Sequence, residues 1–165
     1  MKRRRSCDCE DEPAKKIRDP LSTTVAEPYS GETPVPRFLD CVKEGNIKLV
    51  KENLSRGEQD VQTGFLYACD HGHTEIVNIL LTEEGVDVNS QDIIGKTGFH
   101  YTCEHGHTEI VNVLLTGEGV DINSQDTVGR TGFHLACGNG HTDVIKVLLA
   151  RNDVDVTTQD IWGKT

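Results

Sequence analysis

From residue 38 onward, apolar positions recur at helical spacing in short stretches separated by glycine. Phe99, Thr102 and Cys103 fall on one helical face at i, i+3 and i+4. Gly106 interrupts this stretch, and a second one runs from about Thr108 to Leu115 with its Ile, Val and Leu side chains on one face. The pattern therefore predicts two short helices joined by a tight turn.

This helix pair repeats along the chain with a period of 34 residues. Phe65, Phe99 and Phe133 are each 34 positions apart, and residues 87–120 match residues 121–154 at 18 of 34 positions. One unit is too small to bury its own apolar face, so it has to stack on its neighbours. The repeat therefore predicts an all-α solenoid of stacked helix pairs.

The segment between one helix pair and the next predicts a protruding turn, which we call a finger. Asp92-Ile93-Ile94-Gly95 has Asp at the first and Gly at the last position of a four-residue turn, as a type I turn prefers. Thr97 follows, and its hydroxyl is suited to cap the helix that comes next. Each unit is thus expected to read turn, helix, turn, helix, loop.

The motifs Thr-Gly-Phe-His, Gly-His-Thr-Glu-Ile-Val and Gly-Val-Asp-Val-Asn resemble those of the ankyrin repeat, over about 128 of the 165 residues. The resemblance implies β-turn fingers and a structural role for His73, His107 and His141. It also implies that proteins bind at the finger tips and on the exposed side of the first helices. Gly98 and Gly132 depart from the family, which usually has proline there.

The two ends of the repeat region differ from its middle. Gly45 and Gly72 are 27 residues apart, 7 short of the period, so we expect the first finger to be absent. The chain ends inside a finger, and we expect a fragment, because Val144 and Leu148 would otherwise be half exposed. The expected organisation is a disordered tail (1–36), a degenerate N-terminal capping repeat (37–59), three ankyrin-like repeats (60–91, 92–125 and 126–159) and the start of a further repeat (160–165).

The first 36 residues have a different composition. They contain all five prolines. Residues 1–37 carry 8 basic and 7 acidic side chains, a net +1, whereas the chain from Phe38 onward has 9 basic and 20 acidic, a net −11. Such a segment cannot bury enough apolar surface to fold, so we expect disorder. Two basic clusters have the spacing of a bipartite nuclear import signal, and we expect the protein in the nucleus or cytoplasm. The import residues are Lys2, Arg3, Arg4, Arg5, Lys15, Lys16 and Arg18.

Composition narrows the classes of function. The net charge of −10 makes nucleic acid an unfavourable partner, and no apolar run reaches the roughly 18 residues of a membrane span. No phosphate-binding loop, nucleophile elbow or His-Glu-x-x-His motif is present, so we expect no enzyme. Cys69, Cys103 and Cys137 recur at the period and are expected in the core, too far apart for one zinc ion. We therefore expect no cofactor.

Two surface rows are candidate sites for a protein partner. The finger-tip stripe combines apolar tips with nearby cations: Ile93, Ile94, Lys96, Thr127, Val128, Arg130, Ile161 and Trp162. The concave row varies between otherwise similar units: Asp70, His71, Glu104, His105 and Asn139. By family resemblance, Asn89 and Asn123 are also candidate substrates of an asparaginyl hydroxylase.

The sequence thus predicts a non-catalytic, monomeric protein-interaction module that acts as an adaptor, scaffold or regulator. One alternative is the targeting arm of a larger enzyme whose catalytic domain lies beyond residue 165. Another is nucleic-acid binding through the basic tail, with the steep salt dependence that phosphate contacts produce.

Overall fold

The computed structural model describes residues 37–57 and 60–165. All regular elements within these ranges are helices, which confirms the predicted all-α repeat fold. The helices are α1 Phe38–Lys43, α2 Ile47–Leu54, α3 Val61–His71, α4 Thr74–Leu80, α5 Gly98–His105, α6 Thr108–Thr116, α7 Gly132–Asn139 and α8 Thr142–Leu149. The predicted disordered tail lies outside the described residues.

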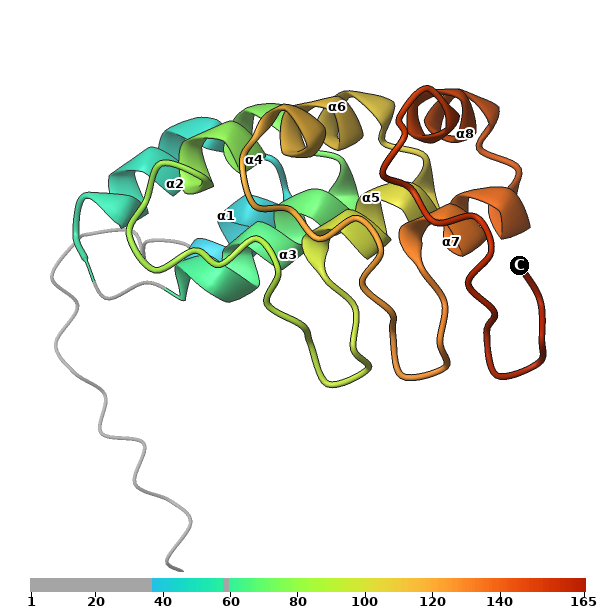
Figure 1. Ribbon diagram of the computed structural model, residues 1–165. Coiled ribbons are helices and arrows are strands. Elements are labelled where there is room, and N and C mark those ends of the chain that lie inside the picture. The colour runs from blue at the N-terminus through green and yellow to red at the C-terminus, as the bar shows by residue number, and fades with distance from the viewer. Residues whose placement is uncertain (1–36, 58–59) are drawn as a thin grey trace, which may run out of the picture. The chain divides into compact units, whose positions relative to one another are not determined.

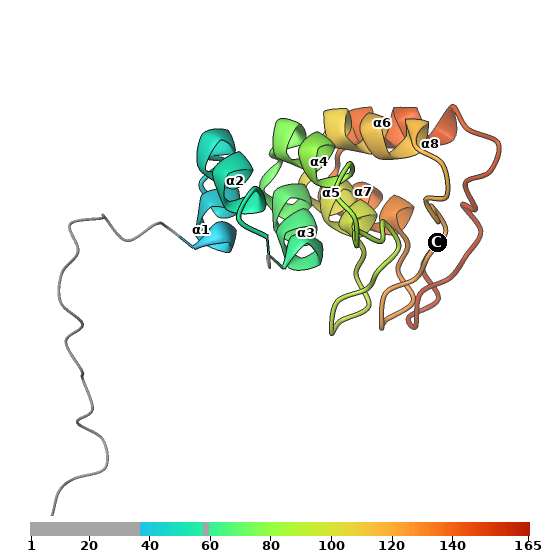
Figure 2. The same ribbon diagram turned by 90° about the vertical axis from the view of Figure 1, so that its left-hand side faces the viewer.

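The helices form two layers that run the length of the stack (Figure 1). Helices α1, α3, α5 and α7 pack side by side in one layer, and α2, α4, α6 and α8 in the other. Turned by 90°, the same stack shows the fingers projecting together beneath the α5–α7 side (Figure 2). The apolar faces of all eight helices meet in one continuous core between the layers.

Local sequence signals set the ends of the helices. The Thr97 hydroxyl accepts a hydrogen bond from the His100 amide, and the His100 ring accepts one from the Thr97 amide, which forms a capping box. Helix α5 ends at His105 and is capped by Gly106, whose φ of 75° is left-handed and therefore favours glycine. These short-range signals explain why α5 begins and ends where the sequence predicts it.

Histidine side chains tie each unit to the one before it. The His107 Nε2–H group donates to the Asp70 carbonyl at 3.0 Å, and His141 donates in the same way to the Glu104 carbonyl at 2.8 Å. Each ring thereby satisfies a carbonyl at the end of a first-layer helix, which would otherwise lack an intrahelical partner. This agrees with the structural role that the family resemblance implied.

The first two helix pairs are joined differently from the others. Six residues separate α2 from α3, whereas seventeen separate α4 from α5. Six residues are too few for a finger of the kind that precedes α5 and α7. The finger before α5 is therefore the first in the stack.

Two expectations about the end of the stack are wrong. Val144 and Leu148 are 0% and 1% exposed, not half exposed, because α8 turns this face toward α6 and α7. Leu149, on the other side of α8, is exposed instead. Cys137 is exposed rather than in the core, because no further helix of the described chain covers that side of α7.

Candidate protein-binding surface

Each finger tip is held by the aspartate that begins it. Asp92 Oδ1 accepts hydrogen bonds from the Ile94 and Lys96 amides, both at 2.9 Å. The same arrangement recurs at Asp126 and Asp160. Because the aspartate satisfies the backbone of the turn, the two residues after it are free to point away from the fold.

The fingers also bond to one another. The Thr127 amide donates to the Ile94 carbonyl at 3.1 Å, and the Ile161 amide donates to the Val128 carbonyl at 3.0 Å. Neighbouring tips therefore lie in register and form one continuous row, visible along the lower edge of Figure 1. Such a row presents its side chains to a partner at little entropic cost.

Large apolar side chains are exposed along this row. Ile93 is 99% exposed, Ile161 65% and Trp162 64%, while Ile94 is 45% exposed. Thr127 is also exposed, but Val128 is half buried. The structure thus brings the predicted tip residues together, with the largest apolar surface at the first and third tips.

The two cations predicted for the finger-tip stripe, Lys96 and Arg130, are less exposed than the sequence predicts. Lys96 is buried, and its ammonium group bonds to the carboxylate of Glu104 on α5. Arg130 is half buried, and its Nε donates to Asp126 Oδ2 at 2.9 Å within its own finger. Lys96 therefore does not belong to the exposed stripe, because its ammonium group is bonded to the Glu104 carboxylate near the end of α5.

The concave row forms a connected cluster on α3 and α5. The Asp70 carboxylate lies 3.3 Å from His71 Nδ1 and 3.4 Å from His105 Nδ1. Both Nδ1–H groups also donate to backbone carbonyls one turn earlier in their helices. Asn139, the corresponding residue on α7, is exposed and, among the residues that the structure describes, bonds only to the Leu135 carbonyl. It carries no charge, so the acidic groups of the row lie on α3 and α5.

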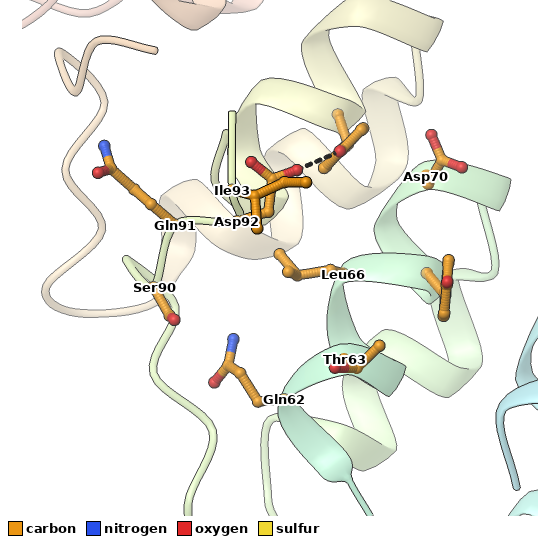
Figure 3. A pocket seen from close by; sticks show the side chains of 10 residues that line it. Gln62, Thr63, Leu66, Asp70, Ser90, Gln91, Asp92 and Ile93 are labelled. Atoms are coloured by element: carbon orange, nitrogen blue, oxygen red, sulfur yellow. Dashed lines mark hydrogen bonds between the residues drawn. The ribbon is translucent and has the colours of Figure 1, made fainter. Parts of the chain in front are cut away.

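A recess of about 390 Å³ lies between α3 and the first finger (Figure 3). Its lining includes Leu66 and Tyr67 from α3, Ile93 from the finger and Tyr101 from α5. Sequence reasoning did not identify this recess. Its signal is the short connection between α2 and α3, which leaves no finger to fill the space.

Asp92 forms part of the recess and is linked to Tyr101. The Tyr101 hydroxyl donates to Asp92 Oδ2 at 2.5 Å. Burial alone would raise the pKa of Asp92, but the hydrogen bonds from Tyr101 and from the backbone of Lys96 and Ile94 outweigh it and lower that pKa. Burial and the bond to Asp92 together raise the pKa of Tyr101. Asp92 is therefore a carboxylate at neutral pH.

Comparison with known families decides the identity of the repeat. The family model for ankyrin repeats, which contains three copies of the repeat, matches residues 38–126 and, in a second match, residues 99–165. Together the two segments cover 128 of the 165 residues. The chain belongs to the ankyrin-repeat family. Ankyrin units stack into extended concave surfaces that bind other proteins.

Two curated relatives share the name 26S proteasome non-ATPase regulatory subunit 10. The Mus musculus protein is 43% identical over 67 residues, which are 41% of this chain and 26% of the relative. The Rattus norvegicus protein is 46% identical over 57 residues, which are 34% of this chain and 24% of the relative. The matched part of this ankyrin chain thus spans about a quarter of the length of these relatives.

The two candidate hydroxylation residues hold neighbouring ankyrin units together. Asn89 Nδ2 donates to the Gly119 carbonyl at 2.6 Å, and its Oδ1 accepts from the Asp121 amide at 2.8 Å. Asn123 makes the same pair of bonds to the backbone of residues 153–155. Both side chains are therefore structural, and hydroxylation of either one stays a prediction.

Three other features were considered in the sequence: a metal site, a membrane span and a nuclear import signal. In the described part of the ankyrin chain, no three His, Cys, Asp or Glu side chains are placed to hold a metal ion. None of the helices in residues 37–57 and 60–165 is long and apolar enough to cross a membrane. The predicted import signal, from Lys2 to Arg18, lies outside the described residues.

Proposed function

We propose that this ankyrin chain is a non-catalytic binding module that holds a protein partner on its finger-tip stripe and its concave row. In this role it acts as an adaptor, a scaffold or a regulator. The observation that carries the proposal is the row of fingers, in which bonded turns present Ile93, Ile161 and Trp162 to solvent. Exposed apolar groups in a rigid row are typical of contact surfaces, and Trp is a frequent anchor residue.

The name of the two relatives supports a regulatory, protein-binding role. Their name describes a regulatory subunit of a larger assembly, and it says that this subunit is not an ATPase. The same type of role for this chain, as a regulatory component bound to another protein, fits its ankyrin fold.

We also propose that the protein is located in the nucleus or cytoplasm. Microscopy of a fluorescent fusion, with and without replacement of Lys2–Arg5, tests the import signal.

The experiment is a comparative affinity capture from eukaryotic cell lysate, quantified by mass spectrometry. The baits are the full chain and a double variant with Ile93→Asp and Trp162→Asp. A matched control carries Leu149→Asp and Val156→Asp, which introduce the same charge at exposed apolar positions away from the finger tips. Equal far-UV circular dichroism of all three baits comes first.

We expect at least one protein to be captured by the full chain and the control, and to be reduced at least fivefold with the finger variant. Capture of identical proteins in equal amounts by all three baits contradicts the role of the finger tips.

A further inference from the structure

The recess beside the first finger is bounded by an open edge of the finger row. Within the row, the amides of Thr127 and Ile161 each donate to a carbonyl of the preceding finger. The equivalent amide of the first finger belongs to Ile93, and no acceptor for it lies among residues 37–57 and 60–165. Ile93 is 99% exposed, so an extended segment of another protein can reach this amide.

The walls of the recess are suited to the stem of a long side chain. Leu66 and Ile93 supply aliphatic surface, and Tyr67 and Tyr101 supply aromatic rings. Leu66 projects into the space between α3 and the finger, as Figure 3 shows. The Lys43 ammonium lies 4.3 Å from the centre of the Tyr67 ring and the Lys96 ammonium 5.1 Å from that of Tyr101, so each ring already has a cation of this chain beside it and offers the recess apolar surface for a stem.

Two carboxylates face the recess without a basic side chain paired to them. Asp92 bonds to the Tyr101 hydroxyl and to backbone amides, and Asp70 lies between two imidazoles. No ion pair of either with Lys or Arg occurs among the described residues. The next finger differs, because Arg130 pairs with Asp126 at 2.8 Å.

The cation that would correspond to Arg130 in the first finger is Lys96. It is buried and bonds to Glu104 instead. Lys96 therefore makes no ion pair with Asp92, although its charge contributes to the lowered pKa of Asp92, whereas Asp126 is paired directly within its own finger. A basic group from outside the chain fits this difference.

We propose that the recess binds a Lys or Arg side chain from an extended segment of a partner protein. The stem of that side chain packs on Leu66 and Ile93, and its charged end lies between Asp70 and Asp92. A backbone carbonyl of the segment accepts the hydrogen bond from the Ile93 amide. This inference rests on the proposed binding function, and it names the chemistry that one part of the surface selects.

The test selects nine-residue peptides from a phage-displayed random library on the immobilised full chain. We expect Lys or Arg at one position to be enriched at least fivefold over its frequency in the library. The best peptide is then synthesised with that residue and with its neutral counterpart, acetyl-lysine or citrulline. We expect the neutral peptide to bind at least tenfold more weakly.

Variants of the chain locate the binding. In Asp70→Asn with Asp92→Asn, the turn survives because the introduced side-chain amide oxygen still accepts both backbone bonds, and we expect at least a tenfold loss of affinity. Asp126→Asn is the matched control, since it removes the same charge from the same position of the next finger. We expect less than a twofold change there. Amide exchange measured by NMR should slow at Ile93 on peptide binding, while the Ile94 amide, already bonded to Asp92, should not change.

Two results would overturn the inference. One is selection of peptides without an enriched basic position, or no selection above the level of an unrelated protein. The other is equal binding of the best peptide to the Asp70 and Asp92 double variant and to the unmodified chain. Neither result decides the proposed function, because capture from lysate tests that function separately through the finger-tip variant.

Discussion

Gly98 sits at the point where one ankyrin unit meets the phenylalanine of the unit before it. A Cβ atom at Gly98 would lie 2.7 Å from Phe65 Cε1 and 3.0 Å from Cys69 Sγ. Phe65 is completely buried, so its ring has no free space to move into. The same contact recurs in the next unit, where a Cβ at Gly132 would lie 2.7 Å from Phe99 Cε1. We therefore predict that the bulky Phe in each unit requires the Gly of the following one.

The effect of Gly98→Ala follows from two opposing contributions. Replacing a helical glycine by alanine stabilises by about 0.4–1 kcal/mol where the backbone permits it. The φ of Gly98 is not left-handed, so this gain applies. Overpacking a rigid core costs about 1–3 kcal/mol. We expect the second contribution to dominate and the free energy of unfolding to fall by about 1 kcal/mol, with a larger loss for Gly98→Pro.

The assay is urea unfolding followed by far-UV circular dichroism, for each single variant and for Gly98→Ala combined with Phe65→Leu. The smaller side chain makes room for the new Cβ, so we expect a favourable coupling energy of at least about 1 kcal/mol. Gly138→Ala is the control, because a Cβ there meets nothing within 4 Å, and it should stabilise the protein. The reasoning is refuted if Gly98→Ala stabilises as Gly138→Ala does, whatever residue stands at position 65.

Four other predictions follow from single contacts. Burial raises the pKa of the Cys69 thiol, so in native protein Cys137 should react with iodoacetamide at least tenfold faster than Cys69, and equally fast in urea, as measured by peptide mass spectrometry. Burial also lowers the pKa of His100, so unfolded protein binds the proton first. The stability due to neutral His100 is present above about pH 6.5 and is lost below it, and the free energy of unfolding should fall between pH 7.5 and 5.5 by more in the unmodified chain than in His100→Gln. Asn123→Asp cannot donate to its carbonyl partner and should lower the free energy of unfolding by about 1–3 kcal/mol in urea unfolding. Leu114→Ala, at a site 2% exposed between stacked units, should cost about 2–5 kcal/mol, and a loss under about 0.5 kcal/mol contradicts the packing described.

The sequence predicts the helices and turns because their determinants are local. The cap at Thr97, the left-handed Gly106 and the turn that begins at Asp92 each involve residues within a few positions of one another. Repetition strengthens these signals, since the same residues recur one period later. The apolar face of each helix is likewise legible from its spacing, and Ile110 and Leu114 are buried as expected.

Contacts between units are harder to infer, because the spacing of a helix does not say what covers its outer side. Cys137 occupies the same position as two buried cysteines and is nevertheless exposed, since burial there depends on a neighbouring helix. Lys96 was expected in the exposed stripe because it lies two residues after an apolar finger tip. Its position is decided by Glu104, which lies eight residues further on in another element.

The differences between units carry information that their similarity does not. Thr97 and Thr131 cap their helices in the same way, so these positions serve the fold that the units share and not a particular partner. Around the first finger, Tyr101 stands where the next unit has Leu135, which has no hydroxyl to bond the aspartate of its own turn. Such changes alter which charges and donors face solvent. A search for the binding specificity of this chain should therefore begin where the units differ, and the recess between α3 and the first finger is where several such differences meet.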